Sequence, residues 1–200
     1  MNIRIEQDDC PGSPREWDNL SRMVCMHRRY DLGDKHDYRE SQFSNWDDLR
    51  KELEQEEGAV VILPLFLFDH SGITMSCSSS RFHMADSAGW DWGQVGFIYA
   101  TKEDILKEFS KKRLSKKLLE KVEEILVNEV KTYDQYLTGD VWGYIIEDDD
   151  GEHLDSCWGF FGHDYCEQEA QEMVDYLEKQ EKERAAELLR VQAAMPCCQP

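Results

Sequence analysis

The chain has 200 residues, 40% of them hydrophobic, which is enough for one domain with a core of ordinary size. Its 42 Asp and Glu against 23 Lys and Arg give a net charge of −19, which opposes direct binding to nucleic acid or to an anionic membrane. The partner favoured by this charge is a protein with a basic surface, and solubility alone is the alternative explanation of the acidity.

The seven cysteines are odd in number, scattered, and not preceded by a signal peptide pattern. This distribution is typical of reduced thiols, so we expect a cytoplasmic protein. The longest apolar run, residues 59–68, is far shorter than the roughly 20 residues that cross a bilayer, so no membrane span is expected.

The first elements follow from local signals. Residues 2–5 alternate like a short strand. Ser13 followed by Pro14 is a typical helix start and predicts a helix over residues 14–27. Residues 28–44 have neither the period of a strand nor that of a helix, so we expect a long surface loop there. Asn45 caps a second helix that ends near residue 56.

The middle of the chain predicts a sheet. AVVILPLFLF, residues 59–68, is the expected central strand, with Pro64 marking a bulge or an edge. Residues 73–77 pair with it as a hairpin, residues 78–92 form a loop, and residues 94–99 add a strand.

Two helices follow. Thr101 caps the first, which ends near residue 110. Ser115 caps the second, residues 116–137, whose apolar side chains recur at steps of three and four, and Gly139 ends it.

The best local signal is VWGYIIEDDDGEHLDSCWGFF, residues 141–161, which predicts a β-hairpin with an acidic tip. A three-residue loop ending at Gly151 places Ile146 opposite Leu154 and Trp142 opposite Trp158, which makes one face apolar. We expect the helix over residues 116–137 to cover that face.

The last segment, residues 167–194, has a helical pattern that becomes polar beyond residue 179. The sequence therefore predicts an α+β fold with a mainly antiparallel sheet of about six strands packed with helices. We expect one domain over residues 1–179 and a partly projecting helical extension over residues 180–200.

Three groups of residues could carry a function. The first is acidic: if residues of the second helix, the hairpin tip and the last helix (167–187) share a face, their carboxylates could imitate DNA phosphates and bind a basic groove. The residues proposed for this contact are Asp47, Asp48, Glu52, Glu147, Asp148, Asp149, Asp150 and Glu152.

The other two groups are alternatives. Cys157, His163 and Cys166 have ligand types suited to zinc, although buried cysteines acting as small hydrophobic residues explain them better. The loop over residues 27–37 combines imidazoles and carboxylates that could bind a divalent ion and hydrolyse a phosphodiester, although a charged surface loop is the simpler interpretation. In neither case does the sequence require a cofactor.

Four segments carry a resemblance: SPREWDNLSRMVCMHRRYDLGDKHDY, LPLFLFDHSGITMS, WDWGQVGFIYATKEDI and VKTYDQYLTGDVWGYIIEDDDGEHLDSCWGFFG. Together they resemble a family of small uncharacterised acidic proteins encoded by bacteriophages and plasmids. The resemblance covers residues 13–162 and implies an accessory protein of a mobile element that acts in the cytoplasm of a bacterial host.

We therefore expect a protein without enzymatic activity that binds and inhibits a host defence complex directed at nucleic acid, of the restriction or CRISPR type. Acidic DNA mimicry is the expected means. One alternative is a metal-dependent hydrolase or nuclease. The other is a sponge that binds a signalling nucleotide, with Trp90, Trp92 and His83 as stacking groups.

Overall fold

The chain forms two compact units. The computed structural model describes the backbone of residues 1–194 and the side chains of residues 1–191. Unit 1 consists of Met1–Pro11 and Asp140–Pro200, and unit 2 is Gly12–Gly139. The expected single domain over residues 1–179 stays a prediction, because the division into two compact units does not say whether the two unfold together. None of the described helices is long and apolar enough to cross a membrane.

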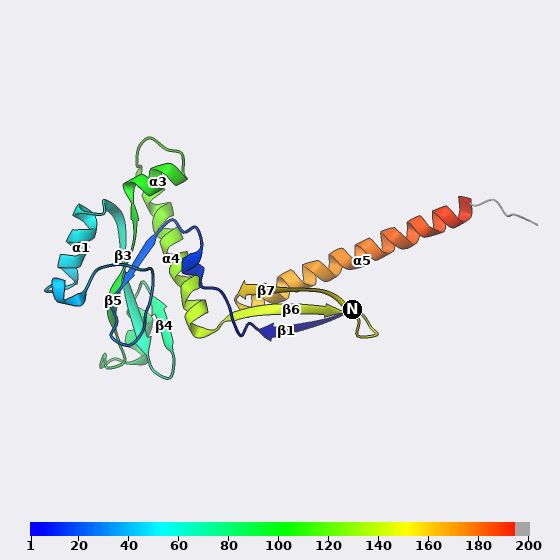
Figure 1. The fold of residues 1–200 in the computed structure, drawn as a ribbon, viewed down its shortest axis with the longest axis horizontal. Helices are drawn as coiled ribbons and strands as arrows, with labels where there is room; N and C mark the ends of the chain where they lie inside the picture. The colour runs from blue at the N-terminus through cyan, green and yellow to red at the C-terminus, as the bar shows by residue number, and fades with distance from the viewer. Residues whose placement is uncertain (195–200) are drawn as a thin grey trace, which may run out of the picture. The chain divides into compact units, whose positions relative to one another are not determined.

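Unit 1 is a three-stranded antiparallel sheet with one long helix on it (Figure 1). Its strand order is β1-β6-β7. The bounds are β1 Asn2–Gln7, β6 Val141–Glu147, β7 His153–Phe161 and α5 His163–Ala194.

Helix α5 covers the sheet face that carries the alternating apolar residues of β6. Tyr144 and Ile146 on that face pack against Cys166, Ala170 and Val174 of the helix, and all five are buried. The predicted apolar face is therefore real, but its cover is α5 and not the helix over residues 116–137.

The predicted hairpin is present in a different register. Ile146 pairs with Asp155, and Trp142 pairs with Phe160. Irregularities between Ile146 and Glu147 and between Trp142 and Gly143 shift the pairing, which a sequence argument that assumes regular strands does not foresee.

One consequence is that Trp158 lies on the face opposite to α5. It pairs with Gly143, and an added Cβ at Gly143 would lie 2.2 to 2.9 Å from ring atoms of Trp158. The indole ring therefore rests directly on the backbone of β6. Cys157 pairs with Tyr144 and lies on the α5 side of the sheet, whereas the predicted register placed it on the face opposite Trp142 and Ile146.

Unit 2 is built around a second antiparallel sheet, in the order β2-β5-β3-β4. The strands are β2 Arg22–Cys25, β3 Ala59–Asp69, β4 Ile73–Ser76 and β5 Trp92–Thr101. The helices are α1 Trp46–Gln55, α2 Ser80–Ala85, α3 Lys102–Glu108 and α4 Lys116–Thr138.

This sheet is covered on both faces, with α1 and α4 on opposite sides in Figure 1. Leu49 and Leu53 of α1 pack under Val24, Phe97 and their neighbours. Another set, from the other side of the sheet and from α4, forms a second core. It includes Met23, Leu65, Ile98, Val122, Leu126 and Val130.

Two predictions for the architecture need correction. The α+β class and the antiparallel pairing are confirmed, but the described chain has seven strands in two sheets and not about six in one. The helix predicted over residues 14–27 is wrong: a single 3₁₀ turn, Pro14–Glu16, is followed by strand β2. Pairing of Met23 and Val24 with β5 outweighs their weak helical period.

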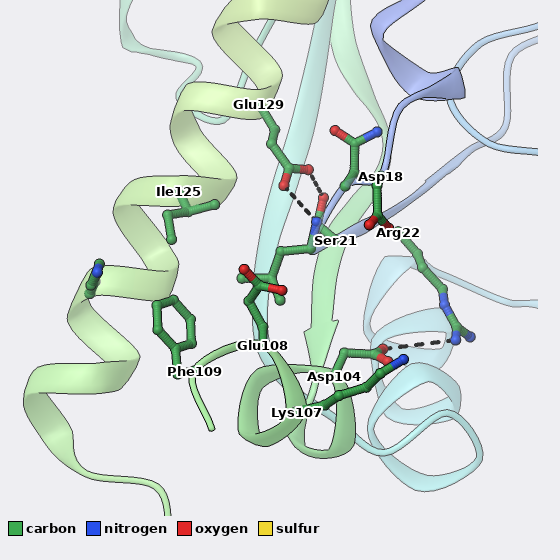
Figure 2. A pocket seen from close by; sticks show the side chains of 12 residues that line it. Asp18, Ser21, Arg22, Asp104, Lys107, Glu108, Phe109, Ile125 and Glu129 are labelled. Atoms are coloured by element: carbon green, nitrogen blue, oxygen red, sulfur yellow. Dashed lines mark hydrogen bonds and ion pairs between the residues drawn. The ribbon is translucent and has the colours of Figure 1, made fainter. Parts of the chain in front are cut away.

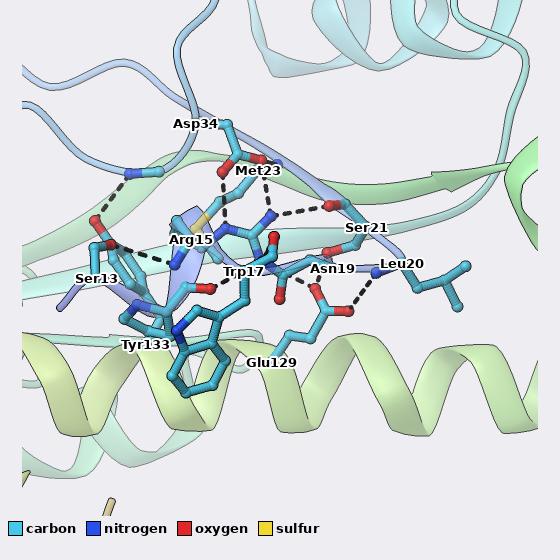
Figure 3. Close-up of polar contacts among 12 residues, drawn as sticks. Ser13, Arg15, Trp17, Asn19, Leu20, Ser21, Met23, Asp34, Glu129 and Tyr133 are labelled. Atoms are coloured by element: carbon cyan, nitrogen blue, oxygen red, sulfur yellow. Dashed lines mark hydrogen bonds and ion pairs between the residues drawn. The ribbon is translucent and has the colours of Figure 1, made fainter. Parts of the chain in front are cut away.

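A buried ion network holds the segment before β2 and the long loop after it (Figure 3). The Arg15 side chain is only 5% exposed and donates to Asp34 at 2.7 and 2.8 Å and to Glu129 of α4 at 3.0 Å. Asp34 also accepts from the backbone N–H of Met23, and Glu129 accepts from Leu20 N–H and the Ser21 hydroxyl. Three distant parts of unit 2 thus share one guanidinium.

We predict that Arg15→Met destabilises the protein by about 3–5 kcal/mol, because it leaves two partly buried carboxylates without a counter-charge. Arg22→Met is the matched control: Arg22 is 56% exposed and pairs with Glu57, so its loss costs less than about 1 kcal/mol. Urea denaturation measures both. Equal losses would contradict the role given to Arg15.

We predict that Gly143→Ala destabilises the protein by about 1–3 kcal/mol, since its methyl group and the Trp158 ring cannot both keep their places. Gly93→Ala, in strand β5 with nothing within 4 Å of the added Cβ, is the control and should be neutral. Thermal unfolding measures the two changes. A neutral Gly143→Ala would show that Trp158 is not packed on β6.

Candidate partner-binding surface

Most of the net charge belongs to unit 1. Residues 1–11 and 140–200 contain 19 Asp and Glu against 5 Lys and Arg, a net charge of −14. Unit 2 contains 23 against 18, a net charge of −5. The smaller unit therefore carries almost three quarters of the charge.

Within unit 1 the charge is concentrated further. Residues 1–11 and 140–177 contain 15 Asp and Glu and one basic side chain, Arg4. The remainder, residues 178–200, contains four acidic and four basic side chains and is neutral. The strongly anionic part of the protein is thus the sheet and the half of α5 that packs on it.

The hairpin tip is one part of this surface. Asp148 closes the turn, because its carboxylate accepts from the backbone N–H groups of Asp150 and Glu152 at 2.9 and 2.8 Å. Asp149, Asp150 and Glu152 are left exposed. Nearby cations are few: the Met1 amino group lies 3.2 Å from Asp149, and Arg4 lies 3.7 Å from Glu147.

The first half of α5 is the other part. Its carboxylates accept hydrogen bonds from glutamines one turn away, Gln168 to Glu172 at 2.9 Å and Gln171 to Asp175 at 3.0 Å. Because glutamine is neutral, these bonds orient the carboxylates without cancelling their charge. The exposed acidic residues along this half are Asp164, Glu167, Glu172 and Asp175.

In the second half of α5, in contrast, the charges of the carboxylates are balanced by cations. Its carboxylates pair with cations: Lys182 with Glu178 at 3.1 Å, Lys179 with Glu183 at 4.0 Å, and Arg190 with Glu187 at 3.6 Å. Every side chain over residues 178–191 is exposed. The acidic stretch predicted over residues 167–187 is therefore two segments with different electrostatics.

Asp47, Asp48 and Glu52 belong to α1 of unit 2 and not to the same unit as the hairpin tip. Asp47 and Asp48 lie in the first turn of α1, where carboxylates favour the helix dipole. Asp48 also lies 3.7 Å from Lys51. These residues have local structural reasons to be acidic, whereas the carboxylates of α5 extend through its second and third turns.

The acidic face predicted from the sequence included the last helix over residues 167–187, a range that contains Glu167, Glu172 and Asp175 but not Asp164. None of these four was among the eight individually named contact residues. A usable signal was present: between residues 140 and 177 no Lys or Arg occurs, and glutamine stands where an i,i+4 cation is common.

The structure does not bring Cys157, His163 and Cys166 together as a metal site. Among the residues described, the group with suitable geometry is His163, Asp164 and Glu167, all exposed at the start of α5. Cys166 is fully buried, and its burial, with a smaller effect of Cys157, raises the pKa of its thiol to about 11. A buried protonated thiol is a packing group.

The loop over residues 27–37 also lacks a shared ion site. Asp34 is occupied by Arg15 and the Met23 N–H, and His36 Nε2 lies 2.8 Å from the Cys25 carbonyl oxygen. His27 Nδ1 accepts from two backbone N–H groups of its own loop. Asp34, His36 and His27 thus make contacts within the chain that help to hold the conformation of this loop.

Unit 2 has a pocket of about 590 Å³ that is lined mostly by polar side chains (Figure 2). Its Arg22 is engaged by Glu57, and Glu129 is held by Arg15 and by the Ser21 hydroxyl. Lys121 lies over the Phe109 ring at 4.9 Å. Ser21 does not have a free base beside it, because the two oxygens of Glu129 already accept from Arg15, the Leu20 N–H and the Ser21 hydroxyl itself.

The aromatic groups of the predicted nucleotide site are only partly assembled. His83 and Trp92 are in edge contact at 6.1 Å, and the Trp92 indole N–H donates to the Asp86 carbonyl. Trp90 is 87% exposed. Backbone N–H groups, that of Asp91 first, lower the pKa of Asp86 and fix this loop.

No protein-family model, curated protein or solved structure matches the chain. The resemblance to phage and plasmid proteins therefore stays a prediction, and the site is argued from its own geometry.

We predict that iodoacetamide at pH 8 labels the exposed Cys10 and Cys157 in the native protein and spares Cys25, Cys77 and Cys166. Burial raises the thiol pKa to about 12, 11 and 11 in these three, so little reactive thiolate is present. Peptide mapping by mass spectrometry measures the labelling of each of these cysteines and distinguishes it from labelling of Cys197 and Cys198, which lie outside the described residues.

The raised pKa values of these three thiols also predict how stability depends on pH. The contribution of the buried thiols to stability is complete below the ordinary thiol pKa of 9.0 and is lost as the pH rises from there through 11 and above. Rapid native labelling of Cys166 would contradict its placement under α5.

Proposed function

We propose that this protein is a non-enzymatic binding protein whose unit 1 presents an anionic surface to a basic, nucleic-acid-binding surface of a partner protein. The observation that carries the proposal is the concentration of 15 carboxylates against one arginine in residues 1–11 and 140–177. Such a surface repels nucleic acid and competes with it for the same basic groove.

The spacing of the carboxylates on α5 supports mimicry of a phosphate backbone. Asp164 and Asp175 are 11 positions apart, which is about 16 Å along a helix. With Glu167, Glu169 and Glu172 between them, the mean separation along the axis is about 4 Å, close to the roughly 3.4 Å along the axis between phosphates of one DNA strand.

The partner follows from the resemblance described above. An accessory protein of a bacteriophage or plasmid acts in a bacterial host, where restriction and CRISPR complexes are nucleic-acid-binding proteins that such elements meet. We therefore propose inhibition of a defence complex of this kind in the host cytoplasm. The hairpin tip, Glu147 to Glu152, belongs to the same proposed contact, as does α5.

We predict that neutralising three carboxylates of α5 weakens inhibition at least tenfold. The variant is Glu167→Gln, Glu172→Gln and Asp175→Asn, and inhibition is measured as the protein concentration that halves DNA binding by a restriction or CRISPR nuclease. Each removed charge reduces both steering and contact energy. Inhibition should also fall steeply with added salt.

The matched control removes three exposed charges of α1 through Asp47→Asn, Glu52→Gln and Glu56→Gln. It changes the net charge equally and should alter inhibition by less than about threefold. Equal losses in both variants would instead support the sequence-based prediction that α1 shares the contact surface. Unchanged inhibition in both would refute acidic mimicry.

A further inference from the structure

The exposed side of α5 carries aromatic rings among its carboxylates. Tyr165 and Tyr176 are 51% and 56% exposed, although both lie in the half of the helix that packs on the sheet. They are 11 positions apart, three turns of helix, so they project from the same side about 16 Å from each other.

Two carboxylates stand between the rings. Tyr165, Glu169, Glu172 and Tyr176 follow one another at steps of four, three and four, which places them in a single row along the helix. We call this row the tyrosine row of α5. Its two ends are aromatic and its centre is anionic.

The ring of Tyr165 is held in place before any partner arrives. It makes an edge contact with Phe160 at 5.9 Å, and the nearby Glu169 carboxylate raises the pKa of its hydroxyl. Glu172 is held in turn by Gln168. An oriented ring loses less freedom on binding than a mobile one, which favours a contact at this position.

The charge of the surroundings decides what can bind to these rings. No Lys or Arg occurs between residues 140 and 177, so the row has no cation of its own on that part of α5. A cation from a partner would meet an aromatic face and a carboxylate within one turn. Guanidinium fits both at once, because it is planar, stacks on aromatic rings and donates two parallel hydrogen bonds to a carboxylate.

We propose that the tyrosine row of α5 is a docking site for an arginine-bearing segment of the partner protein. The inference rests on the proposed function and adds to it a chemical preference, arginine over lysine. Bulk negative charge attracts both cations equally, whereas stacking between rings and carboxylates favours guanidinium over the strongly hydrated ammonium group.

Two labelled peptides of equal charge, ten arginines and ten lysines, test the preference by fluorescence anisotropy on the full chain. We expect the arginine peptide to bind about tenfold more tightly, with both affinities falling as salt is added. Tyr165→Ala with Tyr176→Ala should abolish the preference while leaving affinity for the lysine peptide nearly unchanged. Tyr165→Phe with Tyr176→Phe should keep most of the preference, because the rings remain.

Trp90→Ala is the control, since it removes an exposed ring from unit 2 and should leave the preference intact. Equal binding of both peptides to the unaltered protein would overturn the docking site and leave the charge-driven function standing. Binding of neither peptide would overturn both proposals. A preference that survives the double alanine variant would show that the rings do not create it, and circular dichroism confirms that each variant is folded.

Discussion

Electrostatic repulsion is the constraint on which the shape of unit 1 depends. Fifteen carboxylates on 49 residues repel one another, and only an uncharged core can hold them together. That core is small: it is centred on Tyr144, Ile146, Cys166, Ala170 and Val174. Ten of the fifteen carboxylates lie on α5 or at the hairpin tip, at the surface of unit 1, where water and salt screen them. A surface so costly to maintain is more easily understood as a contact surface than as a solubilising one.

Unit 2 is stabilised mainly by packing on both faces of its sheet. Its charges nearly balance, and its sheet is covered on both faces, so repulsion is small and packing dominates. The regular structure of residues 12–45 consists of the short strand β2 and two 3₁₀ turns, and Arg15 ties this segment to α4 through Asp34 and Glu129. The polar residues of this segment that resemble a catalytic set are used to fix its path.

The parts of the fold that the sequence could predict are those with strong local signals. Caps at Asn45, Thr101 and Ser115 and the left-handed Gly139 mark helix ends where the structure has them. Misplaced elements depended on distant contacts: residues 22–25 are a strand because β5 pairs with them, and the hairpin register depends on two irregularities. The division into two units could not be predicted either, because unit 1 combines residues 1–11 with residues 140–200, which are separated in the sequence by all of unit 2.

The candidate surface could be predicted only in part. Charge counts along the sequence show where carboxylates are, and the hairpin tip followed from them. They do not show that α1 belongs to a unit of nearly balanced charge or that Gln168 and Gln171 occupy the places where cations would neutralise α5. The row formed by Tyr165 and Tyr176 required knowledge of which helix side is buried.

The central claim is that unit 1 makes the contact. Hydrogen–deuterium exchange of the protein alone and mixed with a restriction or CRISPR nuclease of the proposed kind tests this directly, because it reports protection along the whole chain. The account predicts slowed exchange over residues 147–152 and 163–178 with little change over residues 12–139. Protection confined to residues 12–139 would contradict it.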